Sequence, residues 1–129
     1  MGGTDHLCDR RPQTRTRPQI WRAGTATQAP GLYKLARASE VAAIIDAAAV
    51  PYLDAARESL RAGFLPGGTR RNLAWVRPHL DPHVDDQELL LLADAQTSGG
   101  LLVAGELPGH PVIGELVPRR RAAATLTVR

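Results

Sequence analysis

The character of the chain changes abruptly at Gly31, and this change limits where a folded domain can lie. Arg, Thr, Gln and Pro dominate residues 1–30, which follow neither the 3.6-residue period of a helix nor the alternation of a strand. A segment of this kind buries too little apolar surface to offset the entropy that it loses on ordering. We therefore expect residues 1–30 to be a disordered basic segment and residues 31–129 to form one domain.

Positive charge is concentrated in the same segment. The chain has 129 residues, with 16 Lys and Arg against 13 Asp and Glu, which gives a net charge of +3. Residues 1–30 hold five Arg and two Asp, so this segment accounts for the whole excess and residues 31–129 are neutral. A neutral domain gives no electrostatic reason to bind nucleic acid, and we do not expect it to do so.

The sequence has the features of a cytoplasmic protein. Its longest apolar run, Leu89–Ala93, falls far short of the about 20 residues that cross a bilayer. The first residues lack the apolar stretch of a secretory signal. The single cysteine, Cys8, cannot form a disulfide within the chain. We therefore expect neither a membrane partner nor an oxidising compartment.

The expected domain mixes helices with strands. Apolar spacing and breaker residues predict helices over Leu32–Ser39, from Pro51 to a stop at Gly63, and over Gln87–Ala93, with a helical turn or two over Arg70–Val76. Strands are predicted over Val41–Asp46, Leu101–Ala104, Val112–Val117 and Ala124–Val128. We expect the last three to form an antiparallel meander in which Leu101–Ala104 is buried. Because strict βαβ alternation is absent, the pattern favours an α+β fold with packed helices and a mixed or antiparallel sheet.

Two short stretches combine paired glycines with hydroxyl and amide side chains: Pro66–Asn72 (PGGTRRN) and Ala93–Leu102 (ADAQTSGGLL). Paired glycines let backbone N–H groups approach and surround an anion, and Thr, Ser, Asn, Gln and Arg add donors to phosphate oxygens. The candidate phosphate-binding residues are Gly67, Gly68, Thr69, Arg70, Asn72, Gln96, Thr97, Ser98, Gly99 and Gly100. Asp94 is the candidate ligand for Mg²⁺, directly or through water.

Plainer interpretations exist for each stretch taken alone. Gly-Gly beside Thr or Ser is more often an ordinary turn, and neither stretch fits the phosphate-loop or dinucleotide-binding pattern. A residue such as Asp94 also commonly caps a helix. His79 and His83 are four residues apart, but Pro82 disfavours the helix that would place them on one face, so we expect solvated loop histidines there.

Taken together and in this order, the two stretches resemble the C-terminal domain of selenophosphate synthetases (selenide, water dikinases). In that family a Pro-Gly-Gly-Thr-x-x-Asn turn precedes an Asp-Pro-Gln-Thr-Ser-Gly-Gly-Leu-Leu stretch, and here Ala95 stands in place of the second proline. The flanking stretches Tyr33–Ser39, Ile45–Pro51 and Val112–Leu116 are similar as well. The resemblance covers about 99 of the 129 residues. Related domains of the aminoimidazole ribonucleotide synthetase superfamily share the fold but lack the Gln-Thr-Ser-Gly-Gly run.

The resemblance implies both a fold and an activity. The fold is the C-terminal domain of the aminoimidazole ribonucleotide synthetase-like type. The activity is a phosphotransfer in which selenide, ATP and water give selenophosphate, AMP and phosphate with the help of Mg²⁺. ATP, the metal-binding aspartates, a lysine and a reactive Cys or selenocysteine belong mainly to the family's N-terminal domain, through which its homodimers form. The C-terminal domain closes one side of the cleft.

No catalytic residue is carried over to this chain. Cys8 lies in the sequence HLCDR, without the lysine that follows the family's reactive cysteine. We expect a truncated protein that lacks the ATP-binding domain, is inactive alone, and by itself binds neither ATP nor Mg²⁺ tightly. The alternative is a non-catalytic binding module that complements a separate ATP-binding domain. The abrupt loss of similarity before Gly31 is what a shifted reading frame or a wrong start would produce.

Overall fold

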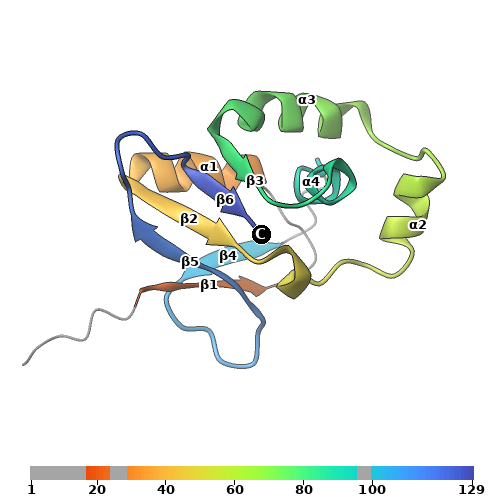
Figure 1. The fold of residues 1–129 in the computed structure, drawn as a ribbon. Coiled ribbons are helices and arrows are strands. Elements are labelled where there is room, and N and C mark those ends of the chain that lie inside the picture. The colour runs from red at the N-terminus through yellow and green to blue at the C-terminus, as the bar shows by residue number, and fades with distance from the viewer. Residues whose placement is uncertain (1–16, 24–28, 96–99) are drawn as a thin grey trace, which may run out of the picture.

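The computed structural model describes residues 17–23, 29–95 and 100–129 (Figure 1). Within these ranges, helices alternate irregularly with short strands, and the strands form a single mixed sheet. The α+β class predicted from the sequence is confirmed. None of the helices in these ranges combines the length and the apolar composition that crossing a membrane requires.

The sheet has six strands in the order β3-β6-β2-β5-β1-β4 (Figure 1). Their bounds are β1 Gln19–Ala23, β2 Val41–Ile45, β3 Leu80–Pro82, β4 Leu101–Ala104, β5 Val112–Pro118 and β6 Leu126–Val128. The pairs β1–β4, β1–β5 and β2–β5 are antiparallel, whereas β6 runs parallel to both β2 and β3. The strand predicted over Val41–Asp46 is confirmed as β2, at the centre of this arrangement.

Strand β1 corrects the expectation that residues 1–30 are disordered. It lies between β4 and β5, and its Ile20 is 2% exposed within the core. Neighbours on both sides supply the hydrogen bonds and the burial that the segment cannot supply for itself. The expectation is therefore wrong for residues 17–23 and 29–30, and the rest of that segment lies outside the described residues.

The predicted antiparallel meander is also wrong. Strands β4 and β5 do not pair with each other, because β1 inserts between them, and β6 pairs with β2 in parallel. Local turn signals between successive strands predict hairpins, but they carry no information about a strand that arrives from the far end of the sequence. Strand β4 lies at the edge of the sheet and is not buried, since Leu101 is 60% exposed.

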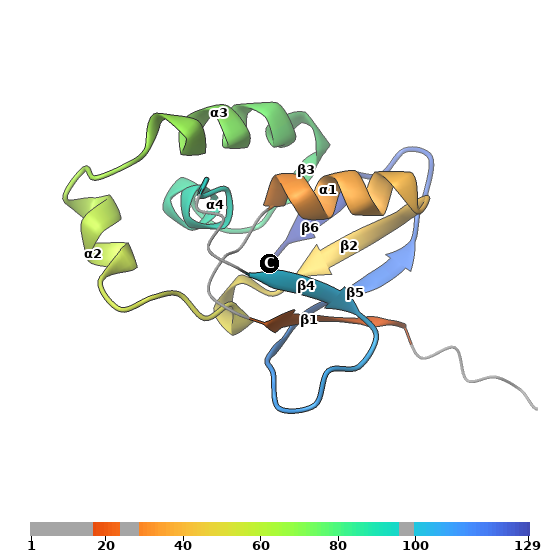
Figure 2. The same cartoon turned by 180° about the vertical axis from the view of Figure 1, so that it is seen from behind.

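Helix α1 (Ala29–Ala38) packs along β2 and buries Leu32, Tyr33 and Ala36 (Figure 2). It confirms the helix predicted over Leu32–Ser39 and begins three residues earlier. The core beneath it is mainly aliphatic, as the low aromatic content requires. Its fully buried side chains include Ile20, Ile45, Leu89, Leu92, Ile113, Leu126, Val76 and Val128.

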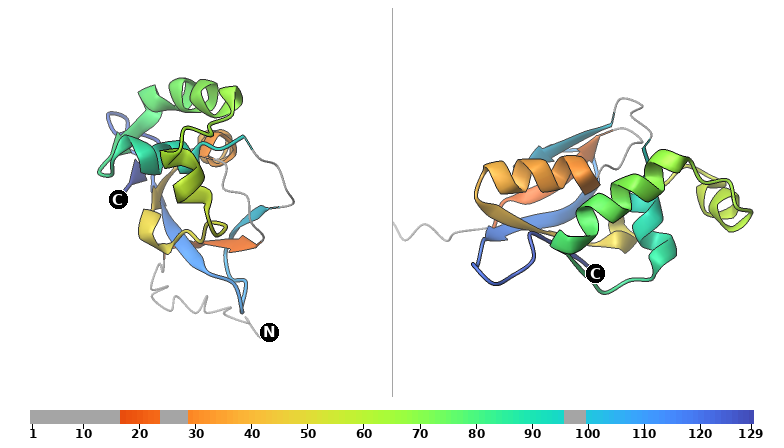
Figure 3. Two further views of the ribbon diagram at one scale, coloured as in Figure 1. Left: turned by 90° about the vertical axis from the view of Figure 1, so that its right-hand side faces the viewer. Right: turned by 90° about the horizontal axis from the view of Figure 1, so that it is seen from above.

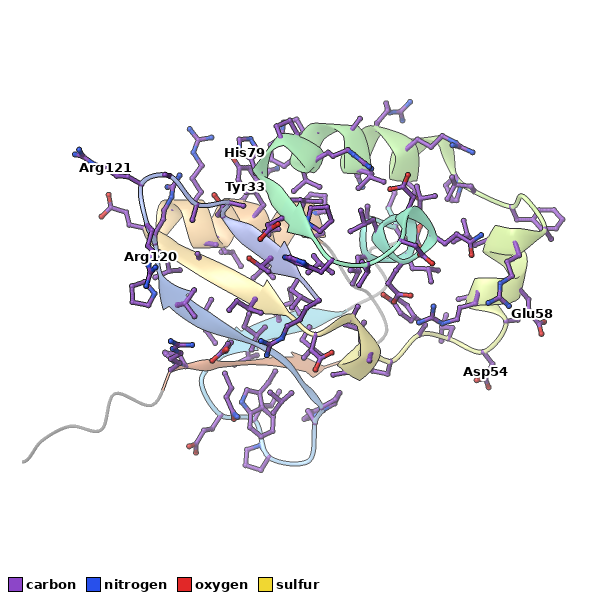
Figure 4. The ribbon with its side chains drawn as sticks, in the orientation of Figure 1. Tyr33, Asp54, Glu58, His79, Arg120 and Arg121 are labelled. Carbon is purple, nitrogen blue, oxygen red and sulfur yellow. The ribbon has the colours of Figure 1, made fainter. Side chains whose placement is uncertain are left out.

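Helices α3 (Gly67–Val76) and α1 lie side by side over the strands, as the view from above shows (Figure 3). Beyond α3, the short helix η2 (Arg77–His79) places the His79 ring parallel to Tyr33 of α1, with centroids 4.4 Å apart (Figure 4). His79 is therefore not a freely solvated loop residue, whereas the exposed His83 meets the Asp81 carboxylate at 3.1 Å. The ring stack joins the end of the α3–η2 segment to α1.

Helix α2 (Ala56–Arg61) differs from α1, α3 and α4 in that none of its residues is buried. It begins at Ala56 and not at Pro51, because Ala55 takes a left-handed backbone conformation with φ of 64°. The predicted stop at Gly63 is confirmed, with φ of 89°. Asp54 and Glu58 point away from the rest of the molecule (Figure 4).

A bidentate ion pair connects α2 to α4 (Asp86–Leu92). The Arg57 guanidinium donates to both Glu88 carboxylate oxygens, at 2.5 and 3.1 Å, and this hydrogen bonding raises the pKa of Arg57. Helix α4 confirms the one predicted over Gln87–Ala93, and it is capped by Asp85, whose carboxylate accepts the Glu88 N–H at 2.8 Å. Helix α4 carries the chain directly into the second glycine-containing stretch.

Candidate functional site

The first glycine-containing stretch forms the start of a helix. Pro66 precedes α3 in an extended conformation, and the Thr69 N–H donates to the Pro66 carbonyl at 3.0 Å. Gly67 and Gly68 are therefore in the first turn of α3, and the separate turn or nest expected there is not formed.

The two stretches meet through Thr69. Its hydroxyl donates to Asp94 Oδ1 at 3.0 Å and accepts the Ala95 N–H at 3.4 Å, and the side chain is fully buried. One turn further along α3, the Asn72 amide donates to the Ala93 carbonyl at 3.1 Å. The Thr69–Asp94 corner, as we call Thr69, Asn72, Asp94 and Ala95, thus joins residues 25 positions apart in the sequence.

Gly68 lies in close contact with the second stretch at this corner. A Cβ added to Gly68 would lie 3.1 Å from the Ala95 Cβ, closer than side chains normally approach. Gly67, in contrast, has open space around its Cα. One glycine of the pair therefore lets the helix approach the second stretch, and the other leaves backbone accessible at the N-terminal end of α3.

The remaining candidate residues divide into three groups. Arg70 lies on α3 with an exposed side chain, and Gly100 lies directly before β4. The group Gln96, Thr97, Ser98 and Gly99 is outside the described residues. The structure therefore brings Gly68, Thr69, Asn72 and Asp94 together. The sequence did not single out the Ala93 carbonyl or the Ala95 N–H, and their only signal was adjacency to Asp94.

The Mg²⁺ site suggested at Asp94 is not complete within the described residues. No group of three or more His, Cys, Asp or Glu side chains gathers in these ranges. The Asp94 carboxylate is partly buried, and its Oδ1 already accepts the Thr69 hydroxyl. Magnesium in proteins usually takes one or two carboxylates together with waters and substrate phosphates. Asp94 can supply one such oxygen.

A pocket of about 200 Å³ opens beside the corner, between α2 and α4. Thr69 and Asp94 form its polar end, and the other lining residues are mainly apolar: Ala56, Ser59, Leu60, Phe64, Leu65, Pro66, Leu90 and Leu91. Phe64, one of these lining residues, is 76% exposed. The polar end of the pocket therefore borders mainly apolar side chains.

Replacing Thr69 with Val is expected to lower the free energy of unfolding by about 1–3 kcal/mol. Valine keeps the shape of the side chain, but the Asp94 carboxylate and the Ala95 N–H each lose a hydrogen bond in this partly buried corner. Chemical denaturation followed by circular dichroism measures this loss. Thr125→Val is the matched control, since it makes the same exchange at a second buried threonine, 3% exposed, that does not belong to the corner. Equal effects of the two substitutions would mean that the corner contributes nothing specific.

The chain is similar to proteins named selenide, water dikinase from several bacteria. It is 48% identical over 71 residues to the one from Porphyromonas gingivalis, covering 55% of this chain and 20% of that protein. The one from Colwellia psychrerythraea is 42% identical over 73 residues, which are 57% of this chain and 21% of the relative. The one from Pseudomonas aeruginosa is 45% identical over an alignment of 106 residues, with 71% of this chain and 30% of the relative covered.

No protein-family model matches the chain. The chain spans a fifth to three tenths of the length of the three relatives described. These matches confirm the resemblance read from the two glycine-containing stretches. By sequence, this chain is similar to selenide, water dikinases over a limited part of their length.

Proposed function

We propose that this chain is the C-terminal portion of a selenide, water dikinase, in which the Thr69–Asp94 corner forms one wall of a phosphate-handling cleft. The other wall is an ATP-binding N-terminal domain, which carries the reactive and metal-binding groups. Phosphoryl transfer depends on positioning and on charge stabilisation at the phosphates, and both walls contribute to these. The chain by itself does not complete a catalytic turnover.

The observation that carries this proposal is the hydrogen bond between Thr69 Oγ1 and Asp94 Oδ1, at 3.0 Å. It fixes the two stretches that mark the resemblance against one another, although they are distant in sequence. The accessible N-terminal end of α3 at Gly67 and the exposed guanidinium of Arg70 lie in the same first turns of the helix. Backbone N–H groups at a helix N-terminus and a guanidinium are complementary to a phosphate.

A second candidate function is that of a non-catalytic module that complements a separately encoded ATP-binding domain. It is favoured by the internal pairing of the corner, whose Thr69, Asn72 and Asp94 side chains are all engaged within the chain. In this role the corner is structural, and the chain contributes a surface to a partner domain. Co-purification with such a domain, without a change in its turnover, would support this second function over the first.

The decisive assay measures AMP formed from ATP in the presence of Mg²⁺, with and without selenide. We expect the purified chain to give no selenide-dependent AMP, and we expect AMP once a separately expressed N-terminal domain of a selenide, water dikinase is added. Selenide-dependent AMP formation by the chain alone would overturn the proposal that the reactive and metal-binding groups belong to the N-terminal domain. Lack of activity in the mixture, with stable complex formation, would favour the second function.

In the active mixture, Arg70→Ala is expected to lower kcat/KM by about tenfold or more, because a hydrogen bond to a charged group contributes about 1.5–3 kcal/mol. The matched control is Arg61→Ala, which removes an exposed Arg from the end of α2. A similar loss for both variants would show that general surface charge, and not the α3 end, is responsible.

A further inference from the structure

Strand β4 has the composition of an interior strand but the position of an outer one. Its sequence, Leu101–Ala104, is uncharged and continuously apolar, which is typical of a strand covered on both faces and both sides. In the sheet it is the outermost strand, with β1 on one side only. Leu101 is 60% exposed. The sequence therefore predicts a further neighbour that the single chain does not supply among its described residues.

The free side of β4 presents a defined set of backbone groups. The Gly105 N–H donates to the Gln19 carbonyl of β1 at 2.9 Å. Because successive residues of a strand direct their backbone groups to opposite sides, Leu102 and Ala104 direct their N–H and C=O groups away from β1. Natural sheet edges usually block such groups with charge, proline or a bulge, and Leu101–Ala104 contains no charged residue and no proline.

An apolar pocket of about 160 Å³ accompanies this free side. It lies between α1 and the outer strands, and its lining includes Ile20, Leu35, Leu102, Ala104 and Leu116. Leu35 on α1 is 59% exposed. The face of the sheet that α1 covers extends beyond the helix to the β4 edge, where its apolar residues are not covered. A neighbouring strand there would bury this apolar surface and would also pair with the free backbone N–H and C=O groups of β4.

The opposite edge of the sheet does not offer a matching surface. Strand β3 has three residues, carries the exposed Asp81 and ends at Pro82, which has no N–H to donate. These are the features that prevent edge pairing. Pairing of β4 with β3 of another molecule, which would build an open filament, is therefore disfavoured, and among pairings between copies of this chain β4 with β4 is the favoured one.

We propose that β4 pairs antiparallel with β4 of a second copy of this chain, about a two-fold axis at Val103. Leu102 then lies opposite Ala104 of the second copy, and the two exchange both backbone hydrogen bonds, while Leu101 lies over the second copy's Gly105. Because β4 is neutral, no like charges meet along the paired strands. This contact joins the two sheets into one and extends beyond the proposed function. It also differs from the pairing through N-terminal domains that the family resemblance implies.

Sedimentation of the complete chain between about 10 μM and 1 mM tests for the dimer, and amide hydrogen exchange at increasing concentration locates it. We expect monomer and dimer in equilibrium, with the Leu102 and Ala104 amides becoming protected as the dimer forms. A chain that stays monomeric over this range, or a dimer in which these two amides exchange freely, overturns the proposal.

Two variants separate this contact from general folding effects. Val103→Lys puts two lysines directly opposite each other at the two-fold axis, with their Cβ atoms about 4.5–5.5 Å apart. Repulsion between their ammonium groups is expected to weaken the dimer at least about tenfold. Ala104→Pro removes one outward N–H and keeps the bonds to β1. Leu53→Lys, at a residue 64% exposed next to α2, is the matched control and should leave the dimer unchanged. Circular dichroism confirms that each variant is folded, and dimers of equal strength in Val103→Lys and Leu53→Lys overturn the proposal.

Discussion

Gly114→Ala is expected to destabilise the fold by about 3 kcal/mol or more, the upper range for overpacking that forces the backbone to shift. A Cβ at this position would lie 2.1 Å from the Ile44 carbonyl oxygen, 3.1 Å from its carbonyl carbon and 3.2 Å from the Ile45 Cα. All three atoms belong to the backbone of β2, so no side chain can rotate away. Gly114 also pairs with Ile20 next to a shift of register in β1. The methyl group therefore separates β5 from β2 or distorts the pairing with β1.

Urea denaturation followed by circular dichroism measures this effect, with Gly67→Ala as its matched control. Gly67 has open space where the Cβ would be added and lies in the first turn of α3, so that substitution should be neutral or slightly stabilising. Equal midpoints for Gly114→Ala and the parent chain would mean that β2 and β5 are not held as closely as the structure describes.

Ile20→Ala is expected to lower the free energy of unfolding by about 2–5 kcal/mol, which is the usual cost of removing a large aliphatic side chain from a core. Ile20 is 2% exposed and belongs to the hydrophobic core together with Ile45 and Ile113. The prediction tests whether the segment before Gly31 is an integral part of the domain. A disordered segment would tolerate the change without loss of stability.

Thermal and urea denaturation of Ile20→Ala should be compared with those of Leu53→Ala. Leu53 is similar in size but 64% exposed, and its truncation should change the free energy of unfolding by about 0.5 kcal/mol or less. If the two variants are equally stable, residues 17–23 do not contribute β1 to the folded domain.

Elements with a strong local signal were predictable from the sequence. Helix α1 follows apolar spacing along one face, and α4 follows an N-cap and a run of leucines from Leu89 to Leu92. Strand β2 follows β-branched residues, and the stop after α2 follows Gly63. In each case the deciding interaction acts between residues a few positions apart, and the sequence displays such spacing directly.

The strand pairing was not predictable in the same way. Strand β1 has no local signal, since its ladder and its burial come from β4 and β5, whose paired residues lie 78 to 96 positions later in the chain. Strand β3 is a further case, because Leu80–Pro82, between the two histidines expected in a loop, becomes a strand only through its pairing with β6. The meander prediction failed for the same reason, as successive strands are neighbours only where no distant strand intervenes.

The candidate site, too, was predictable from the sequence only in part. The residue types in Pro66–Asn72 and in the stretch after Ala93 pointed to the family, which the similarity to selenide, water dikinases confirms. The sequence could not show that Thr69 meets Asp94, since that contact depends on how α3 crosses α4. It also assigned both glycines to a nest, whereas packing against Ala95 explains Gly68.

The sequence by itself determined the α+β class, the aliphatic core, most helices and the family resemblance. These rest on composition, on short-range spacing and on residue types in order, all of which can be read along the chain. The tertiary structure alone decided that β1 completes the sheet, that β4 is left at its edge, and that Thr69 closes the corner with Asp94. Each of these depends on contacts between distant segments, whose free energy is gained only when the whole sheet assembles and which leave no periodic pattern in the sequence.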